Sequence, residues 1–386
     1  MQFAGACPVR PLSPRSVIPW LGACLVLLLA LLVISPGIGS QLTAVGWRQA
    51  WKVRLGLPLD IASLRGDPLA DADGDGDVSP LELSQYRAII RSIGFDQRFA
   101  RSLLALVVGV TLALCGGTFQ VLFRNALATP YTLGIAGGAS LGAVIAIRVG
   151  FTQTWMGVSP VMACAFAGGL GVVAAVLVMA RGPRPLTSNE LLLSGVTLGM
   201  FCAAMMMAVQ TISNERQTFR MIQWMLGSLN TITNAKAITL LPFVLPCWVV
   251  LILSGRALNQ YRLGDELAAS RGVPVVRVQV ICVLVATLGT AAVAANCGPI
   301  GFVGLVVPHV VTLMVGPDCR VMLPAAAILG GAFTIACDWA SQLAMPAAGA
   351  LMGRELGAAL LPIGTVTAMI GVPVFLVMLR TGRFRI

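Results

Sequence analysis

The chain has 386 residues, of which 57% are hydrophobic and only 11% are charged. A soluble domain carries charges at about a quarter of its positions, and the mean hydropathy of +0.89 excludes that class. We therefore predict an all-α polytopic membrane protein with room for about ten transmembrane helices of roughly 20 residues each. Basic residues collect in the cytoplasmic loops of such proteins, so the net charge of +11 does not indicate a nucleic acid partner.

Ten apolar runs follow one another, and we predict that each crosses the membrane. They lie near residues 17–34, 102–123, 131–149, 160–180, 190–212, 237–254, 278–295, 303–315, 322–342 and 363–379. A cleaved signal peptide is the alternative for the first run, because Gly39 and Ser40 suit a cleavage site. We favour a retained span. Most Lys and Arg residues of the short loops fall on the side of the N-terminus, which predicts that both termini are cytoplasmic.

The chain divides into three parts on this pattern. Residues 1–40 form the N-terminus and first span, residues 41–101 form an extracytoplasmic loop, and residues 102–386 form a core of nine spans. The loop holds more than half of the chain's 15 acidic residues, so it is the segment suited to a water-exposed module.

Few ionisable residues lie inside the apolar runs. Asp338 is well within one, and the chain's only histidine, His309, stands beside Pro308 in another. We interpret His309 as structural and Asp338 as hydrogen-bonded within the helix bundle, with a place on a substrate path as the alternative for Asp338. No G-x-x-x-x-G-K-[ST] loop is present, so the chain is not expected to be an enzyme. If transport is powered, the energy comes from another polypeptide.

Five segments rich in small residues support a family assignment. They are RNALATPYTLGIAGGASLG (124–142), WMLGSL (224–229), LGDELAASRG (263–272), GPIGFVGLVVPH (298–309) and LPIGTVTAMIGVPVFLVML (361–379). Together they resemble the signature stretches of FecCD-type permeases, the membrane subunits of ABC importers for iron-siderophores, haem and cobalamin. The match is collinear from about Arg98 to Arg380.

The resemblance implies the permease subunit of a binding-protein-dependent ABC importer in the bacterial inner membrane. We expect an iron(III)-siderophore as cargo, with cobalamin or haem as the alternative. It also implies a homodimer in membrane lipid, two ATP-binding subunits that carry the ATP, and an extracytoplasmic substrate-binding protein. The alternative from another functional class is a calcium-gated channel or an ion-coupled carrier that uses Asp338.

Two groups of site residues follow from the resemblance. The segment 263–272 is expected to contact the ATPase. Asp265 and Glu266 suit the start of a short helix, Ala268 keeps one face thin, and Gly264 and Gly272 bound it. The region around residues 200–228 is expected to line the translocation path. Its candidate residues are Met205, Trp224, Gly227 and Ser228.

Charged residues before two of the spans are candidates for docking the binding protein. Arg98 and Arg101 fit an arginine pair of the family, and Arg354 with Glu355 is expected to replace family charges that this chain lacks. Solvated loop charges are the alternative for that second pair. The departures from the family pattern are Ala126 for a proline, Thr312 and Gln342 for arginines, and Leu360 for an acid.

The outer loop carries a second motif, DADGDGDVSPLE at residues 71–82, which satisfies the EF-hand pattern. Oxygen ligands at this spacing wrap a calcium ion, and the glycine at position 6 makes the sharp turn. The predicted ligands are Asp71, Asp73, Asp75, Asp77, Ser79 and Glu82. A helix with Leu81, Tyr86, Ile89 and Ile90 on one side is expected to follow. Bound calcium either supports docking of the binding protein or has a purely structural role.

Overall fold

The computed structural model describes residues 14–38, 47–59, 64, 70, 78–150, 158–180, 188–230, 234–352 and 360–380. Nearly all of these residues are helical. Among them, eight helices are long and apolar enough to cross a membrane, and two shorter apolar helices, Ile135–Val149 and Val303–Val315, bring the set to the ten predicted spans. The predicted fold class is thus confirmed.

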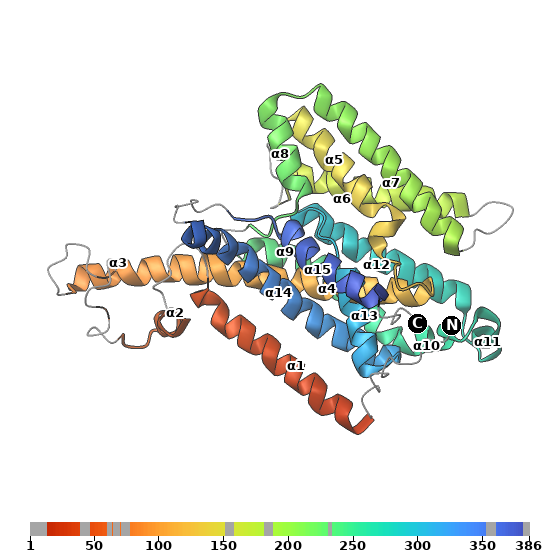
Figure 1. The fold of residues 1–386 in the computed structure, drawn as a ribbon, viewed down its shortest axis with the longest axis horizontal. Helices are drawn as coiled ribbons and strands as arrows, with labels where there is room; N and C mark the ends of the chain where they lie inside the picture. The colour runs from red at the N-terminus through yellow and green to blue at the C-terminus, as the bar shows by residue number, and fades with distance from the viewer. Residues whose placement is uncertain are drawn as a thin grey trace.

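The spans are α1 (Pro14–Ile34), α4 (Ala100–Leu122), α5 (Ile135–Val149), α6 (Pro160–Ala180), α7 (Ser188–Thr211), α9 (Ala235–Leu253), α12 (Val275–Cys297), α13 (Val303–Val315), α14 (Cys319–Met352) and α15 (Ile363–Arg380). Short helices connect them: α2 (Trp47–Arg54), α3 (Pro80–Arg91), α8 (Glu215–Met225), α10 (Gly255–Arg262) and α11 (Asp265–Ser270). The remaining turns are η1 (Ser35–Gly37), the π-helical η3 (Ser92–Phe99) and η4 (Pro130–Leu133). In Figure 1, α2 and α3 lie at one end of the bundle, called here the outer end, and α10 and α11 lie at the opposite, inner end.

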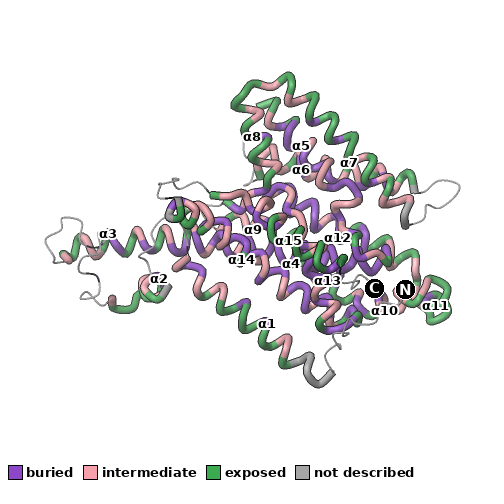
Figure 2. The backbone as a smooth tube through the Cα atoms, in the orientation of Figure 1, coloured by how far each residue is buried: buried purple, intermediate pink, exposed green. Residues whose placement is uncertain are grey.

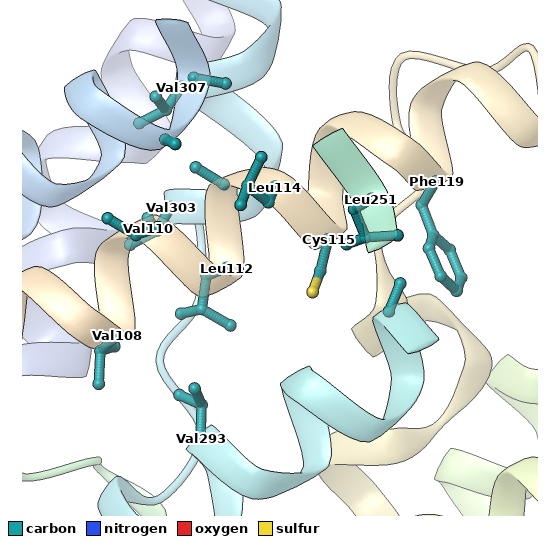
Figure 3. Packing of buried hydrophobic residues seen from close by; sticks show 14 of the residues in the cluster. Val108, Val110, Leu112, Leu114, Cys115, Phe119, Leu251, Val293, Val303 and Val307 are labelled. Carbon is teal, nitrogen blue, oxygen red and sulfur yellow. The ribbon is translucent and has the colours of Figure 1, made fainter. Parts of the chain in front are cut away.

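The central helix is α4, which packs against α9, α12, α13 and α14. Almost all of its residues are buried (Figure 2). Its Val108, Leu112 and Cys115 pack with Val293 of α12 and Val303 of α13 (Figure 3). This close approach depends on small residues, as is usual between membrane helices.

Two glycines of α4 show why a larger residue is excluded. A Cβ atom at Gly116 would overlap the carbonyl oxygen of Gly304, and one at Gly109 would overlap that of Gly330. Helices α13 and α14 therefore pack backbone to backbone against α4. By contrast, α5, α6, α7 and α8 form a group on one side of the bundle, and α7 exposes most of its length (Figures 1 and 2).

Two helices are longer than the apolar pattern predicted. The second span was expected to begin at Ser102, but α3, η3 and α4 form one continuous helix of 43 residues, Pro80–Leu122. The predicted boundary at Arg101 therefore falls inside a helix. Helix α14 extends to Met352, beyond the predicted end at Gln342, and the ten added residues, LAMPAAGALM, are themselves apolar or small.

The outer end has a small hydrophobic core of its own. Ala50, Tyr86, Ile90 and Phe95 are buried there. The Trp51 indole N–H donates to the carbonyl of Val33 at the end of α1, over 2.7 Å. Helix α3 follows the motif as predicted, with Tyr86 and Ile90 facing the core, but Leu81 is exposed, and Leu83 packs against the core instead. We call the part from α2 to η3 the outer module.

Candidate translocation cavity and coupling unit

A cavity of about 610 Å³ lies where the outer ends of several helices meet. Trp224 from α8 lines it, and Gly227 and Ser228 from the following turn do so as well. These are three of the four residues predicted for the translocation path. The structure therefore brings them together around one space.

The turn after α8 depends on glycine. Helix α8 begins at a capping box formed by Asn214 and Gln217, and the chain then reverses at Gly227, whose φ is +73°. A side chain there would be strained by that backbone conformation and would meet the carbonyl oxygen of Pro299. The next backbone N–H, that of Ser228, donates to the carbonyl of Cys297 over 2.7 Å. The turn is thus fixed to the end of α12.

Met205, the fourth predicted residue, lies elsewhere. It is 41% exposed on α7 and does not line this cavity. Its neighbour Met206 is buried against Val144 and Met221. Met205 and Met206 therefore face different surroundings.

The cavity is cationic. Its charged lining residues are Arg101, Arg220 and Lys236, and none of the described lining residues is acidic. The Lys236 ammonium donates to the carbonyl of Asn230 over 2.7 Å. Asn296, also in the lining, has a buried side-chain oxygen without a hydrogen-bond partner. The space thus presents positive charge together with amide groups.

Arg101 is neutralised by a buried ion pair. Its Nε lies 2.5 Å from Oδ1 of Asp338, and the side chains of the two residues are 8% and 0% exposed. The same guanidinium donates to Oδ1 of Asn230 over 2.7 Å. Gln342, one turn after Asp338, donates to its other oxygen over 2.8 Å. The interpretation of Asp338 as hydrogen-bonded within the bundle is confirmed.

Neither arginine of the predicted docking pair is a surface residue. Arg98 is 5% exposed, and its guanidinium donates to the carbonyl of Pro36. Arg101 is occupied by Asp338. Both lie inside a continuous helix rather than in the loop that the prediction assumed, and docking through Arg101 would require it to leave Asp338. Arg354 and Glu355 lie outside the described residues.

At the inner end, the predicted short helix is present as α11. Gly264 and Gly272, with φ of 120° and +79°, bound it, and Asp265 and Glu266 occupy its first turn. Ala268 is buried, as its small size allows, against the neighbouring helices. Leu263 and Leu267 are 57% and 47% exposed. This unit, α10 and α11 together, is called here the coupling unit.

Ser79 and Glu82 are the two predicted calcium ligands that the structure describes. Asp71, Asp73, Asp75 and Asp77 lie outside the described residues. Ser79 and Glu82 form a capping box at the start of α3, in which the Glu82 carboxylate accepts from the Ser79 backbone N–H over 2.9 Å. No cluster of metal-ligating side chains occurs within the part of the chain that the structure describes.

Sequence reasoning missed several members of these sites. Arg220 and Lys236 contributed only to the counting of loop charges, and Asn230 received no role. At the inner end, Asn259 donates to Asp318 over 2.6 Å, a contact between positions 59 residues apart. No local pattern identifies such pairs, because their members meet only in the folded chain.

Comparison with known proteins supports the same family. The FecCD transport family matches residues 72–381. The cobalamin import permease BtuC of Halobacterium salinarum is 32% identical over 98% of this chain and 100% of its own length. The vitamin B12 import permease BtuC of an Escherichia coli strain is 32% identical, over 89% of this chain and 100% of its own. The uncharacterised ABC transporter permease YvrB of Bacillus subtilis is 34% identical over 76% of this chain and 80% of its own.

A solved structure has the same fold. It is an ABC transporter described as of the metal-chelate type, in an inward-facing conformation. The TM-score is 0.72 at 25% identity, covering 94% of this chain and 99% of the other.

Proposed function

Because this chain belongs to the FecCD transport family of ABC importer permeases, we propose that it carries a corrinoid such as cobalamin across the inner membrane. The observation that most strongly supports this proposal is the similarity to a cobalamin permease along 98% of this chain. The iron(III)-siderophore expected from the sequence is not named by these two permeases, which are named for cobalamin or vitamin B12, while the solved structure is described only as of the metal-chelate type. A siderophore or haem is the alternative outcome of the test.

The inner end suits an ATPase partner. The exposed apolar side chains Leu263, Leu267 and Val276 surround α11, and an apolar surface of this kind favours burial against another protein. We therefore place the docking of two ATP-binding subunits here, at the predicted residues Gly264–Gly272. The chain supplies no covalent chemistry in this proposal and acts as the gate.

The outer end suits the delivery of cargo. The cavity opens near Trp224, Gly227 and Ser228, and its positive charge attracts a cargo that carries an anionic group. A substrate-binding protein delivers the chelate to this end, and a second copy of the chain completes the path. The phosphodiester of cobalamin is an anionic group of the required kind.

An ion-coupled carrier or a calcium-gated channel is less well supported. A proton-coupled carrier needs a titratable group that can exchange protons on the path. Asp338 is instead buried and bonded to Arg101 and Gln342. No other acidic residue of the described transmembrane helices lies deep within its span.

Uptake into proteoliposomes tests the proposal. The permease and its ATPase are reconstituted so that the ATPase faces the lumen, and ATP is enclosed in the lumen. The binding protein is added outside the vesicles together with ⁵⁷Co-cyanocobalamin. We expect uptake that stops without ATP, without the ATPase or without the binding protein. Parallel arms with a ⁵⁵Fe-siderophore and with haem identify the alternative cargoes. An ohmic current through the permease alone would favour the channel.

We also propose that the loop at residues 71–82 binds calcium. Two observations about its described end favour this: the Ser79–Glu82 capping box starts α3 where an exiting helix should start, and Val78 packs against the core of the outer module. The affinity expected for an extracellular module is about 10⁻⁴–10⁻³ M.

Calorimetric titration of the full-length, EGTA-treated permease with calcium tests this site. Asp75→Ala should abolish the calcium signal, whereas Asp96→Asn, at an exposed acid of the same module outside the loop, should retain it. Absence of a signal in the parent chain overturns the site. Binding-protein affinity with and without calcium then separates a docking role from a structural one.

A further inference from the structure

Arg124 occupies a backbone position that normally belongs to glycine. It follows the end of α4, where the Arg124 N–H donates to the Val121 carbonyl and the Asn125 N–H donates to the Gln120 carbonyl. This pair of bonds is the Schellman motif, whose residue after the cap adopts a positive φ and is usually glycine. Arg124 has a φ of 47°. A side chain in this conformation is strained, so its presence calls for an explanation in what the side chain does.

The Arg124 side chain holds the coupling unit. Its guanidinium carbon lies 4.9 Å from the centre of the Tyr261 ring, on α10. Nη2 donates to the Tyr261 carbonyl over 2.9 Å, and the same group is paired with the carboxylate of Asp265, in the first turn of α11. One side chain thus links the end of α4 to both helices of the coupling unit.

This link adds little to stability. The side chains of Arg124 and Asp265 are 44% and 58% exposed, and ion pairs in such positions contribute little to folding because water screens them. A strained backbone and a solvent-exposed ion pair are a poor way to stabilise a fold. They are better explained by a need to fix the position of α11 relative to α4.

A second link joins the coupling unit to α14. The amide of Asn259, on α10, donates to Asp318 and accepts from the Cys319 backbone N–H over 2.7 Å. Burial by itself would raise the pKa of Asp318, but hydrogen bonds from Asn259 and Arg320 and the charge of nearby arginines lower it overall. The carboxylate is therefore ionised at neutral pH and available to Asn259.

We propose that Arg124 is the positioning residue that transmits movement of α11 to α4, while Asn259 holds the same unit to the start of α14. The inference rests on the proposed function for its source of movement. Helices α4 and α14 meet again at the outer end through Arg101 and Asp338, beside the cavity. Movement of the coupling unit thereby reaches the cavity along two helices that pack together over their length.

Hydrogen exchange of the purified permease tests the link without cargo or ATPase. In Arg124→Gln, the α11 amides should exchange roughly ten-fold faster than in the parent chain, because α11 has lost its attachment to α4. Tyr261→Leu should act in the same direction. Arg256→Gln, at an exposed arginine of α10, is the matched control and should leave α11 unchanged. Unchanged exchange in Arg124→Gln overturns the inference, whatever the protein transports.

The assembled transporter tests the transmission itself. Arg124→Gln should still co-purify with the ATPase and hydrolyse ATP within about two-fold of the parent, while uptake per ATP falls roughly ten-fold, a coupling change of the usual size. Arg124→Lys keeps the charge but loses the planar stacking, so it should recover only part of the uptake. Equal loss of hydrolysis and uptake would indicate a merely structural role and overturn the proposal. If the parent chain takes up no chelate, the proposed function fails, and the exchange result still decides the link.

Discussion

At the scale of single residues, the buried pair of Arg101 and Asp338 is the charge arrangement with the largest energetic consequence. Removing one partner leaves the other charge buried without compensation, which costs about 3–5 kcal/mol. We predict that Arg101→Met and Asp338→Leu each lower the stability of the detergent-solubilised chain by this amount, and that the double variant is more stable than either single one.

Thermal unfolding followed with a thiol-reactive dye measures this, because most cysteines of the described residues are buried until the chain unfolds. Arg220→Gln, which removes an exposed cation from the same cavity, is the control and should leave the unfolding temperature unchanged. Additive losses in the double variant would show that the two residues do not act as a pair.

The uncompensated cations of the cavity give a second residue-scale prediction. Positive charge around an entrance raises the association rate of an anionic ligand, and salt screens the effect. Cyanocobalamin is neutral overall, so only its phosphodiester interacts with this charge, and we predict that the double variant Arg220→Gln, Lys236→Gln slows cobalamin uptake roughly two- to three-fold at low ionic strength, and by less at high ionic strength. The initial rate of uptake against salt concentration measures this. Arg216→Gln, on α8 but outside the cavity lining, should behave as the parent; equal salt dependence in all three contradicts the prediction.

At the scale of elements, apolar periodicity predicted where the chain crosses the membrane but not where its helices end. The segment before Ser102 is too polar to read as a span, yet the helix continues outward through η3 and α3. It does so because Phe95, Tyr86 and Ile90 pack against α2, and no local sequence pattern predicts that contact. Arg101 was identified as important from its family position. Its partner Asp338 lies 237 residues away in the chain, so the prediction placed Arg101 at the surface instead of in a buried ion pair.

The outer module should unfold independently of the membrane spans. Phe95 is 6% exposed and packs edge-to-face on Trp51, with ring centres 5.0 Å apart. Loss of a buried phenylalanine costs about 3–5 kcal/mol, which is large for so small a core. We predict that Phe95→Ala unfolds α2 and α3 locally and leaves the spans intact.

Hydrogen exchange and limited proteolysis measure this difference. Amides of α2 and α3 should lose protection in Phe95→Ala, whereas amides of α12 and α13 should keep theirs. Leu81→Ala, at a 69% exposed residue of α3, is the control and should change neither. Loss of protection throughout the chain would contradict the idea of an independent module.

At the scale of the whole molecule, the peripheral helices are covered by the rest of the chain far less than the central ones. Helix α7 has only 17% of its most apolar window buried within the chain, compared with 61% for α12. Its Met200 and Met207 are 68% and 71% exposed. Lipid covers such a face in a monomer, and a second copy of the chain covers it in the homodimer expected from the family resemblance.

A lipid-covered face and a subunit interface respond differently when a larger side chain is introduced. Lipid adapts to a larger apolar side chain, whereas a packed protein interface does not. We predict that Met200→Trp with Met207→Trp lowers the dimer fraction of the detergent-solubilised chain, measured by light scattering against twice the 40.2 kDa protomer mass. Leu253→Trp, at a 75% exposed residue of α9, should leave the dimer intact. If the α7 variant dimerises as well as the parent, lipid covers this face, and the subunit contact must be sought on another helix.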